Sequence, residues 1–171
     1  MRPDLSPVFI PGRLAGSEVF WIGLGFLAFF DAIRLSLLPI GGFVPWLLVL
    51  FFTLIALQNR LRAQGRSVAM AFGVIVAAIA VKMVASFLAT VFALYPDFMA
   101  FLQAQGVDIN DPQAMNAAAY NPQFQQIYAE HLQSNPDLVR AISTAGGWPS
   151  MWGYWLVIGL VARRFDALRS A

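Results

Sequence analysis

The sequence predicts an all-α membrane protein with four transmembrane helices, forming one membrane domain over residues 1–171. Its residues are 59% hydrophobic and 12% charged, whereas soluble domains average about 45–50% apolar and roughly 25% charged residues. The apolar residues are concentrated in runs long enough to cross a bilayer. Basic residues flank these runs mainly on one side. Together, these observations indicate a polytopic membrane protein.

The first two predicted spans cover residues 18–38 and 43–57, separated by a breaker cluster at Pro39, Gly41 and Gly42. The preceding segment, residues 1–17, holds three prolines, which discourage a helix. We therefore expect Val8, Phe9 and Ile10 to rest on the membrane surface. The first span is too long for the apolar core of a cleavable signal peptide, so we expect an uncleaved anchor.

The third predicted span covers residues 68–95. Its roughly 28 residues exceed the ~20 that cross a bilayer, so this helix should tilt or project. Small residues, from Ala69 to Ala89, dominate its sequence. Because small residues let helix backbones approach closely in lipid, we expect this span at the centre of the bundle.

Residues 96–147 form a polar segment in which Asn and Gln replace Leu and Phe. Asp111, Asn121 and Asn135 each precede a proline, a pattern that begins helices. We expect three or four short helices here, whose aromatic stripes pack against the bundle or the lipid surface. The fourth predicted span covers residues 148–162, opens with an aromatic belt that includes Trp148 and Trp155, and precedes two arginines.

The distribution of charge predicts the orientation. In a four-span topology, eight of the 11 basic residues lie on one side: Arg2, Arg13, Arg60, Arg62, Arg66, Arg163, Arg164 and Arg169. The other side has Arg140 and five acidic residues. Because basic flanks stay in the cytoplasm, we expect a bacterial inner-membrane protein with both termini inside and residues 96–147 outside.

Three ionisable residues lie within the predicted spans: Asp31 and Arg34 in the first, and Lys82 in the third. Residues three apart share a helix face, and facing lipid would cost each charge at least ~2.5–3.5 kcal/mol. We expect Asp31 to point inward and bridge Arg34 and Lys82. The cluster is open to several interpretations: a salt bridge between helices, cations that snorkel to the outer interface, a contact with a partner subunit, or a proton or ion relay.

No catalytic constellation is recognisable, and we expect neither an enzyme nor a bound metal or cofactor. The chain has no cysteine and one histidine, His131, which we expect to be exposed to solvent. The calcium-loop-like start at Asp108 fails because Pro112 and Ala119 replace ligands. The formal net charge of +2 does not indicate binding to nucleic acid.

The stretch from Arg60 to Ser67, with Gly65 in its middle, predicts a tight cytoplasmic loop over residues 58–67. This Arg-Leu-Arg-Ala-Gln-Gly-Arg-Ser run, with Gly12-Arg13 and Phe20-Trp21 before it, resembles the small bacterial inner-membrane family known as domain of unknown function 805. The resemblance covers the N-terminal half and implies a helical bundle in the inner membrane. Asn59 and Ala63 stand where that family has arginine and aspartate. The resemblance implies no activity.

Arg13, Arg60, Arg62 and Arg66 are expected at one cytoplasmic interface, either as topological anchors or as a site for an anionic head group. The favoured function is a non-enzymatic accessory or structural subunit of a membrane assembly. Its partners would be the lipid bilayer and another membrane protein or further copies of this chain. The alternative is a small ion or solute transporter or channel that uses Asp31, Arg34 and Lys82.

Overall fold

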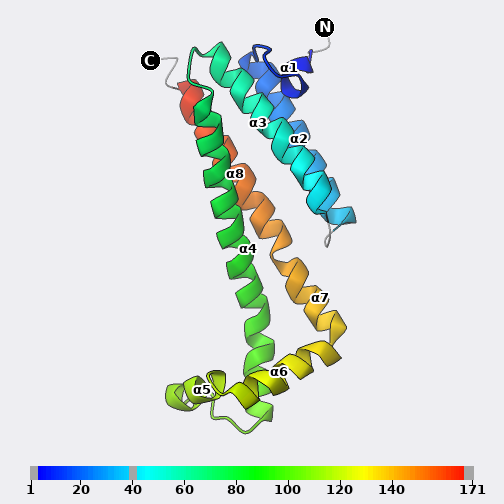
Figure 1. Ribbon diagram of the computed structural model, residues 1–171, viewed down its shortest axis with the longest axis vertical. Helices are drawn as coiled ribbons and strands as arrows, with labels where there is room; N and C mark the ends of the chain where they lie inside the picture. The colour runs from blue at the N-terminus through cyan, green and yellow to red at the C-terminus, as the bar shows by residue number, and fades with distance from the viewer. Residues whose placement is uncertain (1–3, 39–41, 168–171) are drawn as a thin grey trace. The chain divides into compact units, whose positions relative to one another are not determined.

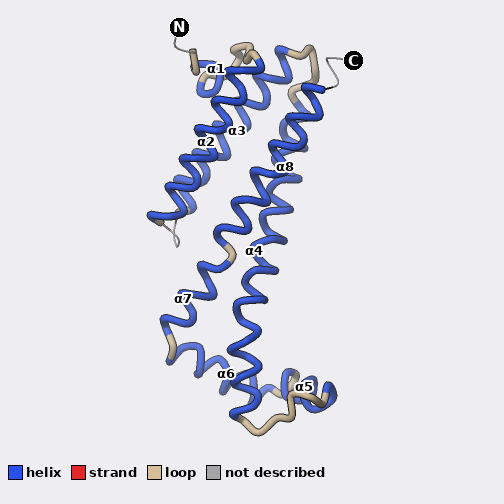
Figure 2. Tube along the Cα trace, turned by 180° about the vertical axis from the view of Figure 1, so that it is seen from behind, coloured by secondary structure: helices blue, strands red, loops and turns tan. Residues whose placement is uncertain are grey.

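The computed structural model describes residues 4–38 and 42–167, and the described chain is helical, with no strand (Figures 1 and 2). Arg2, Arg169 and the expected breaker at 39–41 lie outside the described residues. The chain divides into two compact units. The first comprises the described parts of Met1–Ala85 and Gly147–Ala171, and the second is Ser86–Gly146.

The first unit is built on α2 (Ser17–Leu37) and α3 (Phe43–Ala63), which lie side by side (Figure 1). The short helix α1 (Ser6–Phe9) packs on both of them, and α8 (Gly147–Ala167) packs on α2. The start of α4 (Ala69–Ala104) adds a row of buried residues to the same core. This core includes Phe20, Leu57, Ala71 and Tyr154, all buried.

Within the described residues, three helices are long and apolar enough to cross a membrane: α2, α3 and α4. They begin within one residue of the first three predicted spans. The fourth predicted span corresponds to α8. This helix has 21 residues, as α2 and α3 do, but it is not among the three helices that are both long and apolar enough. Its sequence contains polar residues at Ser150 and Tyr154 and a charged end.

The N-terminal segment differs from the expectation that its apolar residues rest on the membrane surface. Pro7 lies in the first turn of α1, where the missing N–H is harmless. Val8 is fully buried against α2, in the space left by Gly23. Tertiary packing therefore places a short helix where the prolines predicted none.

The expected loop at 58–67 is shorter than predicted, because α3 continues to Ala63. The turn occupies residues 64–68 and includes Gly65 with a φ of +70°, a conformation that glycine adopts without strain. Asn59, Arg60 and Arg62 are therefore helical residues. Buried contacts of Asn59 and Arg60, described below, stabilise this last part of the helix.

α4 is longer than the predicted third span, since it continues through Pro96 to Ala104. Its 36 residues correspond to about 54 Å of helix, well beyond the ~30 Å hydrocarbon core. The expectation that this helix is central is wrong: 17% of its most apolar window is buried, against 39% in α2 and 44% in α3. Phe72, Val76 and Met83 form an exposed apolar stripe along it.

In the second unit, α5 (Pro112–Ala119), α6 (Pro122–Ser134) and α7 (Pro136–Ala145) follow the end of α4. Their number and start points confirm the prediction from the prolines. The side chains of Asp111 and Asn121 accept hydrogen bonds from the backbone N–H two residues on, as N-caps do. Asn135 does not cap in this way and instead donates to the carbonyl oxygen of His131.

Candidate functional site

The first candidate site is the ion pair inside α2. Arg34 Nε lies 2.7 Å from Asp31 Oδ1, and the side chains are 9% and 1% exposed. The second carboxylate oxygen of Asp31 accepts a hydrogen bond of 3.0 Å from Trp155 Nε1 on α8. The predicted pairing of Asp31 with Arg34 is confirmed. The same carboxylate joins α2 to α8, a contact between distant residues that the sequence does not predict.

Arg34 makes a further contact at the start of α3. Its Nη1 donates to the carbonyl oxygen of Gly42, the N-cap residue of that helix, at 3.1 Å. A Cβ at Gly42 would collide with this guanidinium. The pair thus connects α2 with two neighbouring helices, as a structural bridge does.

Lys82 does not bridge to Asp31, contrary to expectation. Its Nζ donates to Ser150 Oγ on α8 at 3.3 Å and lies 5.5 Å from the centroid of the Trp46 ring on α3. Lys82 forms no ion pair with any described residue. Arg34 and Trp155 already occupy both oxygens of Asp31, so the ammonium is satisfied by a hydroxyl and an aromatic face. The three predicted residues therefore form two separate contacts, each of which reaches α8.

The second candidate site lies where α3 ends, around the buried Asn59. The side-chain amide of Asn59 donates to the carbonyl oxygens of Pro7 and Ile10, both at 2.8 Å. Its oxygen accepts from the backbone N–H of Gly12 at 3.0 Å. Asn59 therefore fastens the N-terminal segment to α3 through three hydrogen bonds.

Arg60, the next residue, makes the second ion pair of the first unit. Its Nη2 and Nε lie 2.6 and 3.0 Å from Asp166 Oδ1, while Nη1 donates to the carbonyl oxygen of Ala15. Asp166 also accepts hydrogen bonds from Ser17, Trp21 and Gln64. The carboxylate thus joins the end of α8 to the start of α2 and the end of α3. We call this group the Asp166 hub.

The environment of Asp166 stabilises its charged form. Burial alone raises the pKa of this carboxyl. The hydrogen bonds that it accepts, first among them those from Arg60, together with the guanidinium charge, outweigh burial and hold the pKa below its ordinary value of 3.8. Hydrogen bonds to a carboxylate favour ionisation in this way. Within the hub, the charged carboxylate of Asp166 therefore faces the charged guanidinium of Arg60 at neutral pH.

The other arginines of the predicted interface are arranged differently. Arg66 lies over the ring of Phe165 at 5.2 Å from its centroid. Arg13 and Arg62 are exposed, and neither makes an ion pair with a described residue. The guanidinium of Arg62 lies beside Gly12. Of the four predicted interface arginines, Arg60 is buried against Asp166 and Ala15, whereas Arg13 and Arg62 are exposed and could contact an anion.

In the second unit, the aromatic stripes of α4 and α6 pack against each other. Phe101 lies 5.0 Å from Tyr128 and 4.9 Å from His131, centroid to centroid. Asp97 accepts a hydrogen bond from the hydroxyl of Tyr128 and faces His131 Nε2 at 3.2 Å. Burial, and then this bond, raise the pKa of Tyr128 above its ordinary value of 10.0. The expectation that His131 is simply exposed to solvent is therefore wrong.

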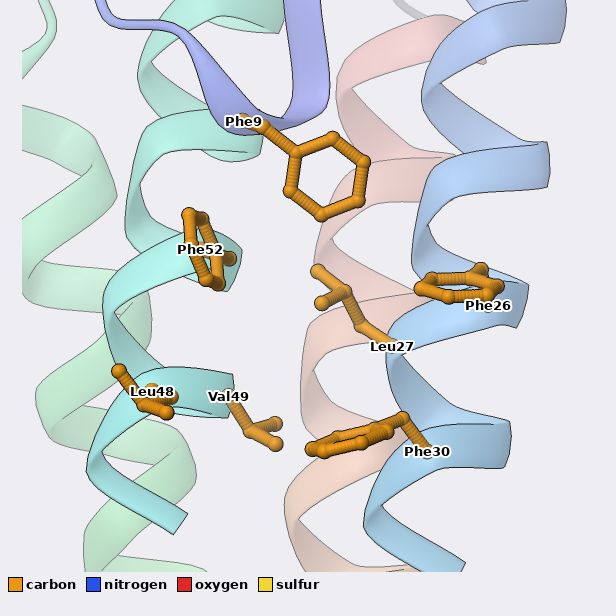
Figure 3. Close-up of a pocket in the computed structure, with 7 residues that line it drawn as sticks. All are labelled: Phe9, Phe26, Leu27, Phe30, Leu48, Val49 and Phe52. Carbon is orange, nitrogen blue, oxygen red and sulfur yellow. The ribbon is translucent and has the colours of Figure 1, made fainter. Parts of the chain in front are cut away.

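An apolar groove lies between α2 and α3 (Figure 3). Its volume is about 190 Å³. Phe9 projects from α1 at one end of the groove, and its ring contacts the rings of Phe26 on α2 and Phe52 on α3. The wall residues are Phe26, Leu27, Phe30, Leu48, Val49 and Phe52.

Several of these partners could not be found by the sequence analysis. Asp166 and Trp155 lie more than 100 residues from the residues that they contact, and their sequence neighbourhoods suggest only a basic tail and an aromatic belt. For Asn59, the sequence does contain a usable signal. This polar residue follows Phe52 by seven residues, which is two helical turns, so it lies on the same helix face as that aromatic residue.

The described residues gather no group of three or more His, Cys, Asp or Glu side chains that could hold a metal ion. Comparison with models of protein families, with curated proteins and with solved structures finds no match. The interpretation of the site therefore rests on its own geometry.

Proposed function

We propose that this protein is a non-enzymatic accessory subunit of a bacterial inner-membrane assembly, with both termini in the cytoplasm and α8 as a fourth span. The observation that carries the proposal is the exposed stripe of α4. Phe72, Val76 and Met83 are exposed and recur at helical spacing on one face of α4, and 17% of the most apolar window of this helix is buried. Such a face suits a transmembrane helix of another subunit.

The contacts of the charged residues support a structural role. Asp31 and Arg34 connect α2 to α3 and α8, and the Asp166 hub connects the same three helices at another level. Breaking a buried pair leaves an uncompensated charge, which costs about 3–5 kcal/mol. Such pairs therefore select one packing of the bundle, and a rigid bundle presents α4 to a partner in one orientation.

The cytoplasmic location of the termini is supported by the arginines at one end of the first unit. Arg60, Arg62 and Arg66 follow one another on α3 and its turn, and Arg13 lies in the segment that Asn59 fastens to the same helix. Basic residues at the end of a span are retained in the cytoplasm. The resemblance of this stretch to the domain of unknown function 805 family is consistent with that placement.

Native mass spectrometry after gentle solubilisation from native membranes tests the proposal. We expect a partner of defined stoichiometry. Val76→Trp on the α4 stripe should reduce its recovery, whereas Leu156→Trp, at an exposed position of α8, should not. A chain recovered alone, or as copies of itself only, would argue against the accessory role.

The second candidate function is ion or solute transport, favoured by the burial of Asp31 and by Lys82 lying within an apolar helix. Lys82→Met in proteoliposomes separates the two functions. A transport path through this residue predicts loss of flux with the bundle intact. A structural role predicts instead a lower melting temperature, because Ser150 and Trp46 lose their charged partner.

A further inference from the structure

The groove between α2 and α3 has the chemistry of the bilayer interior. Its wall consists of aromatic and aliphatic side chains only. Leu27 and Val49 form a buried floor, whereas Phe26, Phe30 and Leu48 are 50%, 42% and 51% exposed. Both helices are candidate membrane spans. The groove therefore opens toward hydrocarbon, with Phe9 closing one end (Figure 3).

The size of the groove selects its occupant. The groove is an open, wholly apolar space of about 190 Å³, which a flexible hydrocarbon chain can enter. A helix, at about 10–12 Å in diameter, is too wide to enter. The space matches a segment of a single acyl chain.

Two exposed cations, Arg13 and Arg62, follow the residues at the end of the groove that Phe9 closes. Arg13 follows Phe9 by four residues, a reach of at most about 14 Å. Arg62 follows Phe52 by ten residues on the same helix, about 15 Å. Half of the hydrocarbon core is also about 15 Å thick. A phosphate at these arginines therefore lies at the right distance from a chain segment in the groove.

These arginines differ from the neighbouring basic residues. Arg60 is bound to Asp166, and Arg66 covers a ring, whereas Arg13 and Arg62 make no ion pair with a described carboxylate. The guanidinium of Arg62 also lies beside Gly12, the residue that precedes Arg13 in the chain.

We infer that the groove and the two arginines form a binding site for one anionic phospholipid of the cytoplasmic leaflet. An acyl chain lies between α2 and α3 beneath Phe9, and the phosphate lies at Arg13 and Arg62. Asn59 builds the site, because its three hydrogen bonds hold α1 and Gly12 in place. The inference rests on insertion in the membrane with both termini in the cytoplasm and not on the accessory role, so recovery of a partner leaves it unaffected.

The test is native mass spectrometry of the full chain in detergent, titrated with phosphatidylglycerol or with phosphatidylcholine of the same acyl chains. The wild-type chain should retain phosphatidylglycerol preferentially. Arg13→Gln with Arg62→Gln should weaken phosphatidylglycerol binding by up to about thirtyfold, since each arginine near an anionic head group contributes about fivefold. Arg163→Gln, an exposed arginine on α8, is the matched control.

The groove is tested separately by filling it. Leu48→Trp, or the milder Leu48→Phe, should weaken retention of both lipids, whereas Leu47→Trp, exposed on the same helix but outside the groove, should not. Far-ultraviolet circular dichroism checks that each variant is folded. Equal lipid retention by the Leu48 and Leu47 variants would overturn the acyl-chain site. Equal loss in the double variant and in Arg163→Gln would overturn the phosphate site. A dimer that disappears only in the Leu48 variants would assign the groove to a second copy of the chain.

Discussion

Replacing Asn59 with leucine is the most direct test of how the N-terminal segment is held. Leucine has a similar size and shape but makes none of the three hydrogen bonds to Pro7, Ile10 and Gly12. Each such bond contributes about 1 kcal/mol net, and a buried group left unpaired adds to the loss. We therefore expect the opening of residues 4–15 to become easier by about 3 kcal/mol.

Hydrogen exchange measured by mass spectrometry on the full chain in detergent reads this opening directly. A change of about 3 kcal/mol corresponds to roughly a hundredfold loss of protection. The backbone N–H of Ile10, which donates to the carbonyl oxygen of Ser6 within α1, reports it, whereas the N–H of Gly12 loses its acceptor, Asn59 Oδ1, in the variant itself. The effect should be confined to this segment, while α2 and α3 keep their protection.

Gln58→Leu is the matched control, since Gln58 precedes Asn59 on α3 and is only partly buried. Equal protection of residues 4–15 in the two variants would refute the assignment of Asn59 as the clamp. Apolar packing of Val8 and Phe9 would then account for the position of α1. A uniform loss of protection throughout α2 and α3 would also contradict it, because that result indicates global destabilisation.

Two further predictions concern packing and pH. Gly23→Ala should lower stability by about 1–3 kcal/mol, because its Cβ would overlap Val8. Gly25→Ala is the control and should leave stability unchanged, because nothing lies within 4 Å of a Cβ there. Similar melting temperatures for the two variants would refute the tight contact. The lowered pKa of Asp166 means that its contribution is fully present above its ordinary pKa of 3.8 and is lost as the pH falls through the lower folded value. Melting temperatures measured from about pH 6 to about pH 3 should therefore fall more steeply in the wild-type chain than in Asp166→Asn, and parallel curves would contradict the stabilising role of the hub.

Long apolar runs and proline pairs predicted where the helices from α2 to α7 begin, to within one residue. Long apolar runs placed the starts of α2, α3 and α4 within one residue, because a membrane span needs a continuous apolar stretch of defined length. The Asn-Pro and Asp-Pro pairs placed α5, α6 and α7, because capping and a fixed proline φ act locally. The ends of helices were less accurate: α3 continues past Leu57, and α4 passes through Pro96.

Partners of the charged residues were predictable only where both lie on one helix. Asp31 and Arg34 are three residues apart, so helix geometry alone brings them together. Lys82 was assigned the wrong partner because the choice between Asp31 and Ser150 depends on how α4 and α8 pack. Arg60 and Asp166 are separated by 106 residues, and nothing local connects them.

The sequence by itself determined that the chain is helical and apolar enough for a membrane, because these properties depend on composition and on the length of apolar runs. The tertiary structure alone decided that Val8 is buried, that Asn59 holds α1, that Asp166 joins three helices, and that a groove remains between α2 and α3. These features depend on which faces of the helices pack together. Contacts between residues distant in the chain determine that packing, and such contacts produce no repeating pattern in the sequence.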